Sequence, residues 1–295
     1  MSVMVVGQIG RDMVLQTPDL SGTGGTHPVR ERREMLGGKG ANQAVGLAQL
    51  GVPVGLIGVV GADEPGATAL QQASSDGIDT AHVVRRGTTA LLVSVVDDSA
   101  NRLLLEHVPQ HALLTPDDID RGRAALLAAD TVSVQLQQPI ESTLRAARQG
   151  RQAGALVLAD GAVDPDHSDE LFELVHVFRA DADEAELLAG EPVRTAAAAT
   201  ALASRILRKG PVLVALAIPG VGDLLVWRDG SRLFPLSSAP VVDRTGAGDA
   251  FMAGLIAALR RDADPVQAGH LATAAASSTV GHLGGRPQLD GLRHA

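Results

Sequence analysis

The sequence has 295 residues, of which 45% are hydrophobic and only 2% aromatic, and its formal net charge is −9. This supports one large aliphatic core, with or without a small appended unit. The acidic balance argues against nucleic acid or an anionic membrane as the main partner. The absence of cysteine excludes disulfides and thiolate metal sites. Without a signal-peptide pattern or an apolar run of membrane-spanning length, we expect a cytoplasmic protein.

Short β-branched runs alternate with alanine-rich helical stretches along the chain. The predicted strands are Val3–Val6, Val54–Val60, Thr131–Leu136, Ala155–Ala159, Val175–Phe178 and Val212–Leu216. The predicted helices are Ala41–Leu50, Gly66–Ser75, Ile119–Ala128, Glu141–Gln149, Asp183–Leu188, Thr195–Arg208, Ala250–Arg260 and Pro265–Val280. This alternation predicts right-handed βαβ units and a doubly wound, mostly parallel sheet with helices on both faces.

Two segments interrupt the alternation. Met13–Met35 is rich in glycine, threonine and proline and has few helix signals. Further on, Ala90–Val96 and Arg102–Val108 have the pattern of two strands joined by the polar turn Asp97–Asn101. Both segments could form a small β-flap beside the main sheet; the alternative is that they are only edge strands and surface loops.

The segment Asp243–Phe251 has the pattern of an anion-binding turn that opens a helix. Gly246, Ala247 and Gly248 have little or no side chain, so their backbone N–H groups can converge on a charged ligand. The helix that follows favours phosphate through its unpaired N–H groups and its dipole. Asp249 places a carboxylate at the mouth of this turn. Because such a carboxylate can accept the proton of a group that attacks phosphorus, the segment predicts a kinase.

A second glycine-rich turn, Gly37–Ala44, also leads into a helix. Its glycines allow a ligand to approach the backbone, while Lys39 and Asn42 offer hydrogen-bond donors and an amide. The spacing is not that of a Walker A loop. Taken alone, this segment fits a tight strand–helix turn as well as it fits a binding loop.

Together, the two turns resemble the signatures of the ribokinase-like, phosphofructokinase-B family of carbohydrate kinases, with the turn Gly37–Ala44 in its ribokinase form. Other stretches that match the family pattern are Val60–Asp63, Asp76–Asp79, Glu184–Gly190 and Gly281–Pro287. The resemblance covers essentially residues 1–295 and implies a single domain with the ribokinase-like α/β fold. It also implies a small β-sheet lid over the sugar, formed by about residues 11–36 and 88–108 and often used as a homodimer clasp.

The reaction that the resemblance implies is ATP-dependent phosphorylation of a sugar hydroxyl. Asp249 corresponds to the general base, and the backbone of Gly246, Ala247 and Gly248 would stabilise charge on the transferring phosphoryl group. Because a helix N-terminus lowers the basicity of Asp249, we expect it to take the proton late. The residues that match the family's sugar site are Asp12, Gly38, Lys39, Asn42 and Gln137.

The same correspondence assigns cation and nucleotide positions. Glu184 matches the residue that organises Mg²⁺ through water, which suits an ion that keeps several water ligands. Asp243 and Gly285 would lie at a monovalent-cation site, for which K⁺ is the candidate. The positions that match the family's nucleotide site are Asp181, Ala215, Gly220, Thr245, Gly246 and Gly248.

Several polar positions depart from the family pattern, among them Gly10, Gln137, Asp160, Asp181 and Ala215. At Gln137 an amide stands in place of a sugar-contacting acid, which changes the hydroxyls that can be bound. An unpaired buried hydroxyl costs roughly 1–3 kcal/mol, enough to shift substrate preference ten- to hundredfold. The missing hydroxyl at Ala215 would weaken ATP binding without abolishing it.

The leading hypothesis is therefore a kinase for ribose or a related pentose, with another sugar or a nucleoside as alternative acceptors. A catalytically silent sugar- or nucleotide-binding homologue is a second reading, motivated by the altered polar positions. A nicotinamide-dependent oxidoreductase is poorly supported, because no dinucleotide fingerprint follows the first strand.

Overall fold

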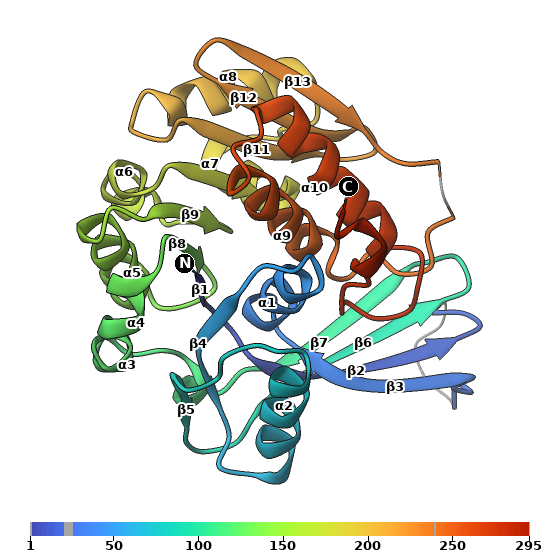
Figure 1. The fold of residues 1–295 in the computed structure, drawn as a ribbon. Coiled ribbons are helices and arrows are strands. Elements are labelled where there is room, and N and C mark those ends of the chain that lie inside the picture. The colour runs from blue at the N-terminus through green and yellow to red at the C-terminus, as the bar shows by residue number, and fades with distance from the viewer. Residues whose placement is uncertain (1, 21–25, 239, 295) are drawn as a thin grey trace.

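The computed structural model describes residues 2–20, 26–238 and 240–294, so part of the predicted lid segment 11–36 lies outside the described residues. Two sheets and their flanking helices make up the molecule (Figure 1). The larger sheet has nine strands in the order β13-β12-β11-β10-β9-β8-β1-β4-β5. Its members are β1 (Val3–Val6), β4 (Val54–Val60), β5 (Val83–Arg85), β8 (Thr131–Gln135), β9 (Leu156–Asp160), β10 (Val177–Ala180), β11 (Leu213–Ile218), β12 (Gly222–Trp227) and β13 (Gly230–Pro235).

Every neighbouring pair from β11 to β5 is parallel, and only β12 and β13 run antiparallel to their neighbours. Central strands such as β1 and β8 are buried along their whole length. Strands buried on both faces need continuous apolar runs, which is what made them visible in the sequence. The prediction of a mostly parallel, doubly wound α/β fold is confirmed.

Helices cover both faces of this sheet. One face packs against the first two and last two long helices: α1 (Lys39–Gln49), α2 (Glu64–Ser75), α9 (Ala247–Leu259) and α10 (Pro265–Thr279). The other face packs against α3 (Pro116–Arg121), α4 (Arg123–Ala128), α5 (Ile140–Gln152), α6 (Pro165–Leu174), α7 (Ala182–Ala189) and α8 (Ala196–Leu207). Two short 3₁₀ turns, η1 (Gln110–Ala112) and η2 (Asp290–Leu292), complete the described elements.

The smaller sheet has the order β3-β2-β6-β7, with β2 (Gly10–Thr17), β3 (Glu31–Gly37), β6 (Ala90–Asp97) and β7 (Arg102–His107). It lies to one side of the larger sheet (Figure 1). The predicted hairpin is present, and the side chain of Asp97 accepts hydrogen bonds from the backbone N–H groups of Ser99 and Asn101 in its turn. The β-flap prediction is confirmed, and the alternative of isolated edge strands and loops is wrong.

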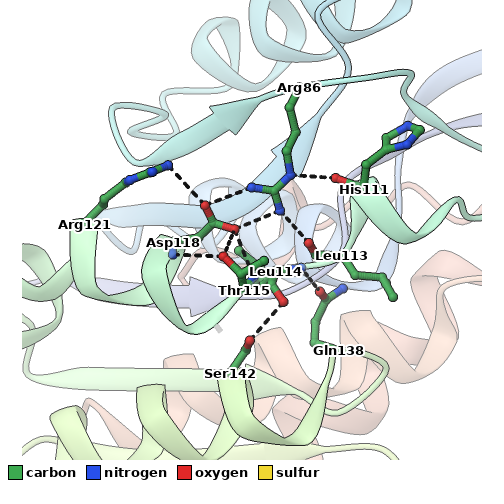
Figure 2. Close-up of polar contacts among 9 residues, drawn as sticks. All are labelled: Arg86, His111, Leu113, Leu114, Thr115, Asp118, Arg121, Gln138 and Ser142. Carbon is green, nitrogen blue, oxygen red and sulfur yellow. Dashed lines mark hydrogen bonds and ion pairs between the residues drawn. The ribbon is translucent and has the colours of Figure 1, made fainter.

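A polar cluster ties the chain leaving the small sheet to the chain entering it (Figure 2). The guanidinium of Arg86, just before β6, donates to the carbonyl oxygens of His111 at 2.7 Å and Leu113 at 2.6 Å. The same group pairs with Asp118 of α3 at 2.8 Å. Asp118 also forms a capping box with Thr115. The segment that precedes β6 and the segment that follows β7 are therefore held together beside Asp118 of α3.

One predicted helix was wrong, and several elements were missed. The expected helix Ile119–Ala128 is interrupted at Gly122, which ends α3 and precedes α4. Helix α6, strand β5 and the β12–β13 hairpin were also missed, because none of them was predicted.

Candidate active site

The predicted site residues meet beside the carboxyl ends of the central parallel strands, where open α/β sheets bind ligands. Helix α9 begins at Ala247, and its N-cap residue Gly246 has a φ of 76°. A Cβ on Gly246 would collide with the carbonyl oxygen of Gly285, so the turn requires glycine. Asp249 lies in the first turn of α9, and its Oδ2 accepts a hydrogen bond from Asn42 Nδ2 at 3.0 Å. The two glycine-rich turns thus lie in direct contact.

Burial raises the pKa of Asp249 to about 7, and the nearby charge of Asp160 adds to the rise. Lys39, Asn42 and Arg179 act in the opposite direction without cancelling the effect. The expectation that the helix N-terminus leaves Asp249 weakly basic is therefore wrong, because loss of solvation outweighs the stabilisation of the charge. A carboxyl group with this pKa is well matched to taking up a proton near neutral pH.

Asp12, on β2 of the small sheet, is held against the glycine-rich turn Gly37–Ala44. A Cβ on Gly37 would occupy the space of the Asp12 carboxyl group, and a Cβ on Gly38 would lie 2.7 Å from the carbonyl oxygen of Gln8. Asp12 Oδ1 and Asn42 Oδ1 are both buried without a hydrogen-bond partner among the described residues. An unpaired buried acceptor costs about 1–3 kcal/mol. Both atoms are therefore suited to accept from hydroxyl groups of a ligand.

The two carboxyl groups influence each other. The pKa of Asp12 is raised to about 7, first by burial and second by the charge of Asp249. The charge of Arg102, from the first position of β7, acts to lower it. The charge of Asp249 therefore makes Asp12 hold its proton to a higher pH.

Lys39 and Glu184 form an ion pair across the site, with Nζ 2.8 Å from Oε1. Burial alone would lower the pKa of Lys39, but the charges of Asp160 and Glu184 raise it well above its ordinary value. The other oxygen of Glu184 accepts the backbone N–H of Asp181 in the capping box that starts α7. Glu184 is thus held between Gly37–Ala44, the predicted sugar-side turn, and the start of α7.

A buried chain of polar side chains lies behind these groups. Arg179 of β10 donates to Asp160 of β9 at 2.9 Å, and Gln43 of α1 donates to the other oxygen of Asp160 at 2.9 Å. Ser133 of β8 donates to Gln43 at 2.9 Å. Sequence reasoning did not identify Arg179, although an arginine within the apolar run Val177–Ala180 was a visible signal.

Two clefts open onto the site. The larger, of about 750 Å³, is lined by polar groups that include Lys39, Asp181, Asp183 and Asp249. The smaller cleft, of about 320 Å³, is mainly apolar. It lies between the β11–β12 region and helices α9 and α10, and the residues that line it include Gly220, Leu236, Val241, Phe251 and Val280. Arg179, Arg244, Ala247 and Gly248 line both clefts. The predicted phosphate turn, Asp243–Phe251, therefore lies between a polar space and an apolar space.

Asp243 links the phosphate turn to the closing glycine-rich segment. Its Oδ1 accepts from the backbone N–H of Thr245 at 2.9 Å, and its Oδ2 accepts from the N–H of Gly284 at 3.0 Å. Arg102 donates to Thr245 Oγ1 at 2.9 Å, so the small sheet also touches the phosphate turn. Among the described residues, no group of three or more histidine, aspartate or glutamate side chains is arranged to hold a metal ion directly.

Two of the predicted residues lie apart from these contacts. Gln137 is exposed, just beyond the end of β8, and lines neither cleft. Ala215 is buried within β11 with 1% of its surface exposed. Ala217, two residues further on, lines both clefts instead.

Residues 1–290 match the sequence model of the pfkB family carbohydrate kinases, and the chain belongs to this family. It is 28% identical to a ribokinase of Haemophilus influenzae over 291 residues, covering 98% of this chain and 95% of that protein. It is 31% identical to an ATP-dependent ribose-1-phosphate kinase of Halopiger xanaduensis over 289 residues, covering 96% and 93%. The crystal structure of a ribokinase from Thermotoga maritima, 27% identical, matches with a TM-score of 0.81 over 97% of this chain and 95% of that one.

The family resemblance found in the sequence is thereby confirmed, together with the assignment as a carbohydrate kinase. No helix in the described part of the chain is long and apolar enough to cross a membrane.

Proposed function

We propose that this protein transfers the γ-phosphoryl group of ATP to a hydroxyl of a small sugar, with ribose or a related pentose as acceptor. The observation that carries the proposal is the contact between Asp249, at the start of α9, and Asn42 of the sugar-side turn. Beside it, the unpaired acceptors of Asp12 and Asn42 offer binding positions for hydroxyl groups. A base, an acceptor site and a phosphate turn are thus combined in one place.

In this reaction, Asp12 and Asn42 orient the sugar so that one hydroxyl faces Asp249. The hydroxyl oxygen forms a bond to the γ-phosphorus while its proton passes to Asp249. The bond between that phosphorus and the bridging oxygen breaks, and its electron pair leaves with ADP. The backbone N–H groups of Gly246 to Gly248 stabilise the charge on the transferring group, and most of the catalytic effect comes from such positioning and electrostatics.

ATP binding is assigned to the two clefts that share the phosphate turn. The base and ribose occupy the apolar cleft near Gly220, and the phosphates extend towards Gly248. The donor set fits Mg²⁺ bound through water rather than directly, because Glu184 is already paired with Lys39 and with the cap of α7. When bound, Mg²⁺ neutralises phosphate charge. K⁺ beside Asp243 and the carbonyl of Gly285, and a cytoplasmic location, remain predictions.

A phosphorylated pentose is a second candidate acceptor. Arg102 of the small sheet reaches the phosphate turn, and its charge acts on Asp12 at the acceptor site. A guanidinium in this position could bind a phosphate carried by the sugar, since arginine matches phosphate geometry well. The relative named for ribose-1-phosphate as substrate is also 31% identical to this chain.

The whole chain then acts as one kinase domain in which the small sheet is the lid over the sugar. The lid also supports a homodimer, because Leu103 and Leu105 of its edge strand β7 are 49% and 54% exposed. Alternate residues of a strand share a face, so these two leucines form one apolar surface. Light scattering on the purified protein tests this: a monomer at micromolar concentration would contradict the dimer.

The activity is tested by measuring ADP release with Mg-ATP across ribose, other pentoses, hexoses, nucleosides and ribose 1-phosphate, with and without K⁺. The Asp249→Asn variant is the control. Turnover on ribose that disappears in the variant supports the proposal, and preference for ribose 1-phosphate supports the second candidate. No turnover on any acceptor, with sugar or ATP binding still measurable, would favour the silent homologue.

A further inference from the structure

Arg179 is a buried cation that the mechanism above does not use. Only 6% of its surface is exposed, and it lies in β10 between strands of the large sheet. Its Nη1 donates to Asp160, which is one of the positions where the sequence departs from its family's pattern. Asp160 is in turn held by Gln43. The partner of the arginine is thus itself held in place, and this unusual aspartate is explained by the presence of the arginine.

The guanidinium of Arg179 lies directly behind the phosphate turn. A Cβ on Gly248 would lie 2.6 Å from both Nη1 and Nη2, so glycine at 248 is what leaves room for this group. Arg179 lines both the polar and the apolar cleft. Among the described residues, the buried Nε of Arg179 has no hydrogen-bond partner, whereas Nη1 is bound to Asp160. One nitrogen of the guanidinium is therefore paired within the protein, while another donor of the same group is left without a protein acceptor.

We propose that Arg179 binds the β- and γ-phosphates of the nucleotide and stabilises their charge during transfer, with Asp160 as the residue that positions it. This inference rests on the proposed kinase function. A guanidinium is permanently charged and matches two phosphate oxygens at once. Held in a site with little water, it acts on developing charge without having to reorganise.

The competing explanation is that Arg179 only neutralises Asp160 inside the sheet. An ion pair of this kind would need no position beside Gly248 and no contact with either cleft. Around Arg179 lie the carboxyl groups of Asp160, Glu184, Asp223 and Asp249 and the ammonium group of Lys39, so that acidic groups outnumber basic ones. A bound phosphate would add further negative charge to this acidic surrounding, so a cation has to face it directly. This is the role assigned to Arg179.

The test measures nucleotide affinity by calorimetry for ATP, ADP and AMP, each with Mg²⁺, in the wild type, in Arg179→Met and in Arg179→Met/Asp160→Asn. The double variant is included because Arg179→Met alone leaves Asp160 as an unpaired buried charge, which is strongly destabilising. Asp160→Asn is the matched control that keeps the cation. Loss of a charge-assisted hydrogen bond is expected to weaken ATP binding by roughly 10- to 100-fold.

We expect that loss for ATP, a smaller one for ADP and the smallest for AMP, in both variants that lack Arg179. Turnover should fall in parallel, with a decrease in kcat as well as a rise in KM for ATP. If the folded double variant binds ATP as the wild type does, Arg179 is only a partner of Asp160 and the inference is overturned. Failure of the wild type to phosphorylate any sugar would instead count against the kinase proposal, while the ATP, ADP and AMP affinities would still decide the role of Arg179.

Discussion

Replacing the catalytic carboxyl group is expected to stabilise the protein at neutral pH and above. Burial raises the pKa of Asp249 from 3.8 to about 7 in the folded state. The folded protein therefore holds this proton more tightly than the unfolded chain, and stability falls as the pH rises from about 4 to about 7. At 1.36 kcal/mol per pKa unit, the shift corresponds to about 4 kcal/mol. An asparagine at this position cannot ionise, so Asp249→Asn does not lose this stability as the pH rises.

The assay is urea unfolding of the wild type and Asp249→Asn at pH 5, 6, 7 and 8. The free energy of unfolding of the variant, relative to the wild type, should increase with pH and level off above about pH 7. Asp229→Asn is the matched control, because Asp229 is exposed in the turn between β12 and β13. A difference for Asp249→Asn that does not change with pH would refute the reasoning.

Four further results are expected. The value of kcat/KM should rise with pH through a midpoint near pH 7 and level off about one pH unit above it, as Asp249 loses its proton; a flat profile between pH 5 and 8 would exclude it as the base. Asn42→Ala removes the 3.0 Å hydrogen bond to Asp249 and should lower kcat/KM about 10²-fold in steady-state assays with ATP saturating. Gly248→Ala places a Cβ 2.6 Å from the Arg179 guanidinium and should lower kcat at least about tenfold, whereas unchanged kinetics would show that the guanidinium can move aside. Leu105→Glu should convert a lid-mediated dimer into monomers in light scattering, and a persistent dimer would place the interface elsewhere.

The parts of the fold that the sequence predicted are those with strong local signals. Buried parallel strands are continuous apolar runs, and the two glycine-rich turns combine small residues with a following helix. Helix α6 was missed because Pro165–Leu174 is largely polar, although Asp164 as a cap and Pro165 in the first turn were usable signals. The β12–β13 hairpin was missed although Asp229-Gly230 is a strong turn signal.

The same distinction between local sequence signals and features set by the whole fold applies to the site residues. Asp249 and Asn42 could be singled out because each belongs to a glycine-rich turn with a recognisable pattern. Arg179 stood out only as a charged residue in an apolar run, because its role depends on Asp160 of a neighbouring strand and on the space behind Gly248. The basicity of Asp249 was predicted with the wrong sign, because the dipole of its helix is a local property while its burial is set by the whole fold.

The hydrogen bond between Asn42 and Asp249 joins residues that are 207 positions apart in the chain. Such a contact closes a very long loop, and contacts of this separation make folding slow. It also requires α1 and α9 to be packed together on one face of the sheet. During refolding, enzymatic activity should therefore return after most of the helical circular-dichroism signal. The delay between the two signals would measure how long the C-terminal helices take to pack onto the N-terminal half.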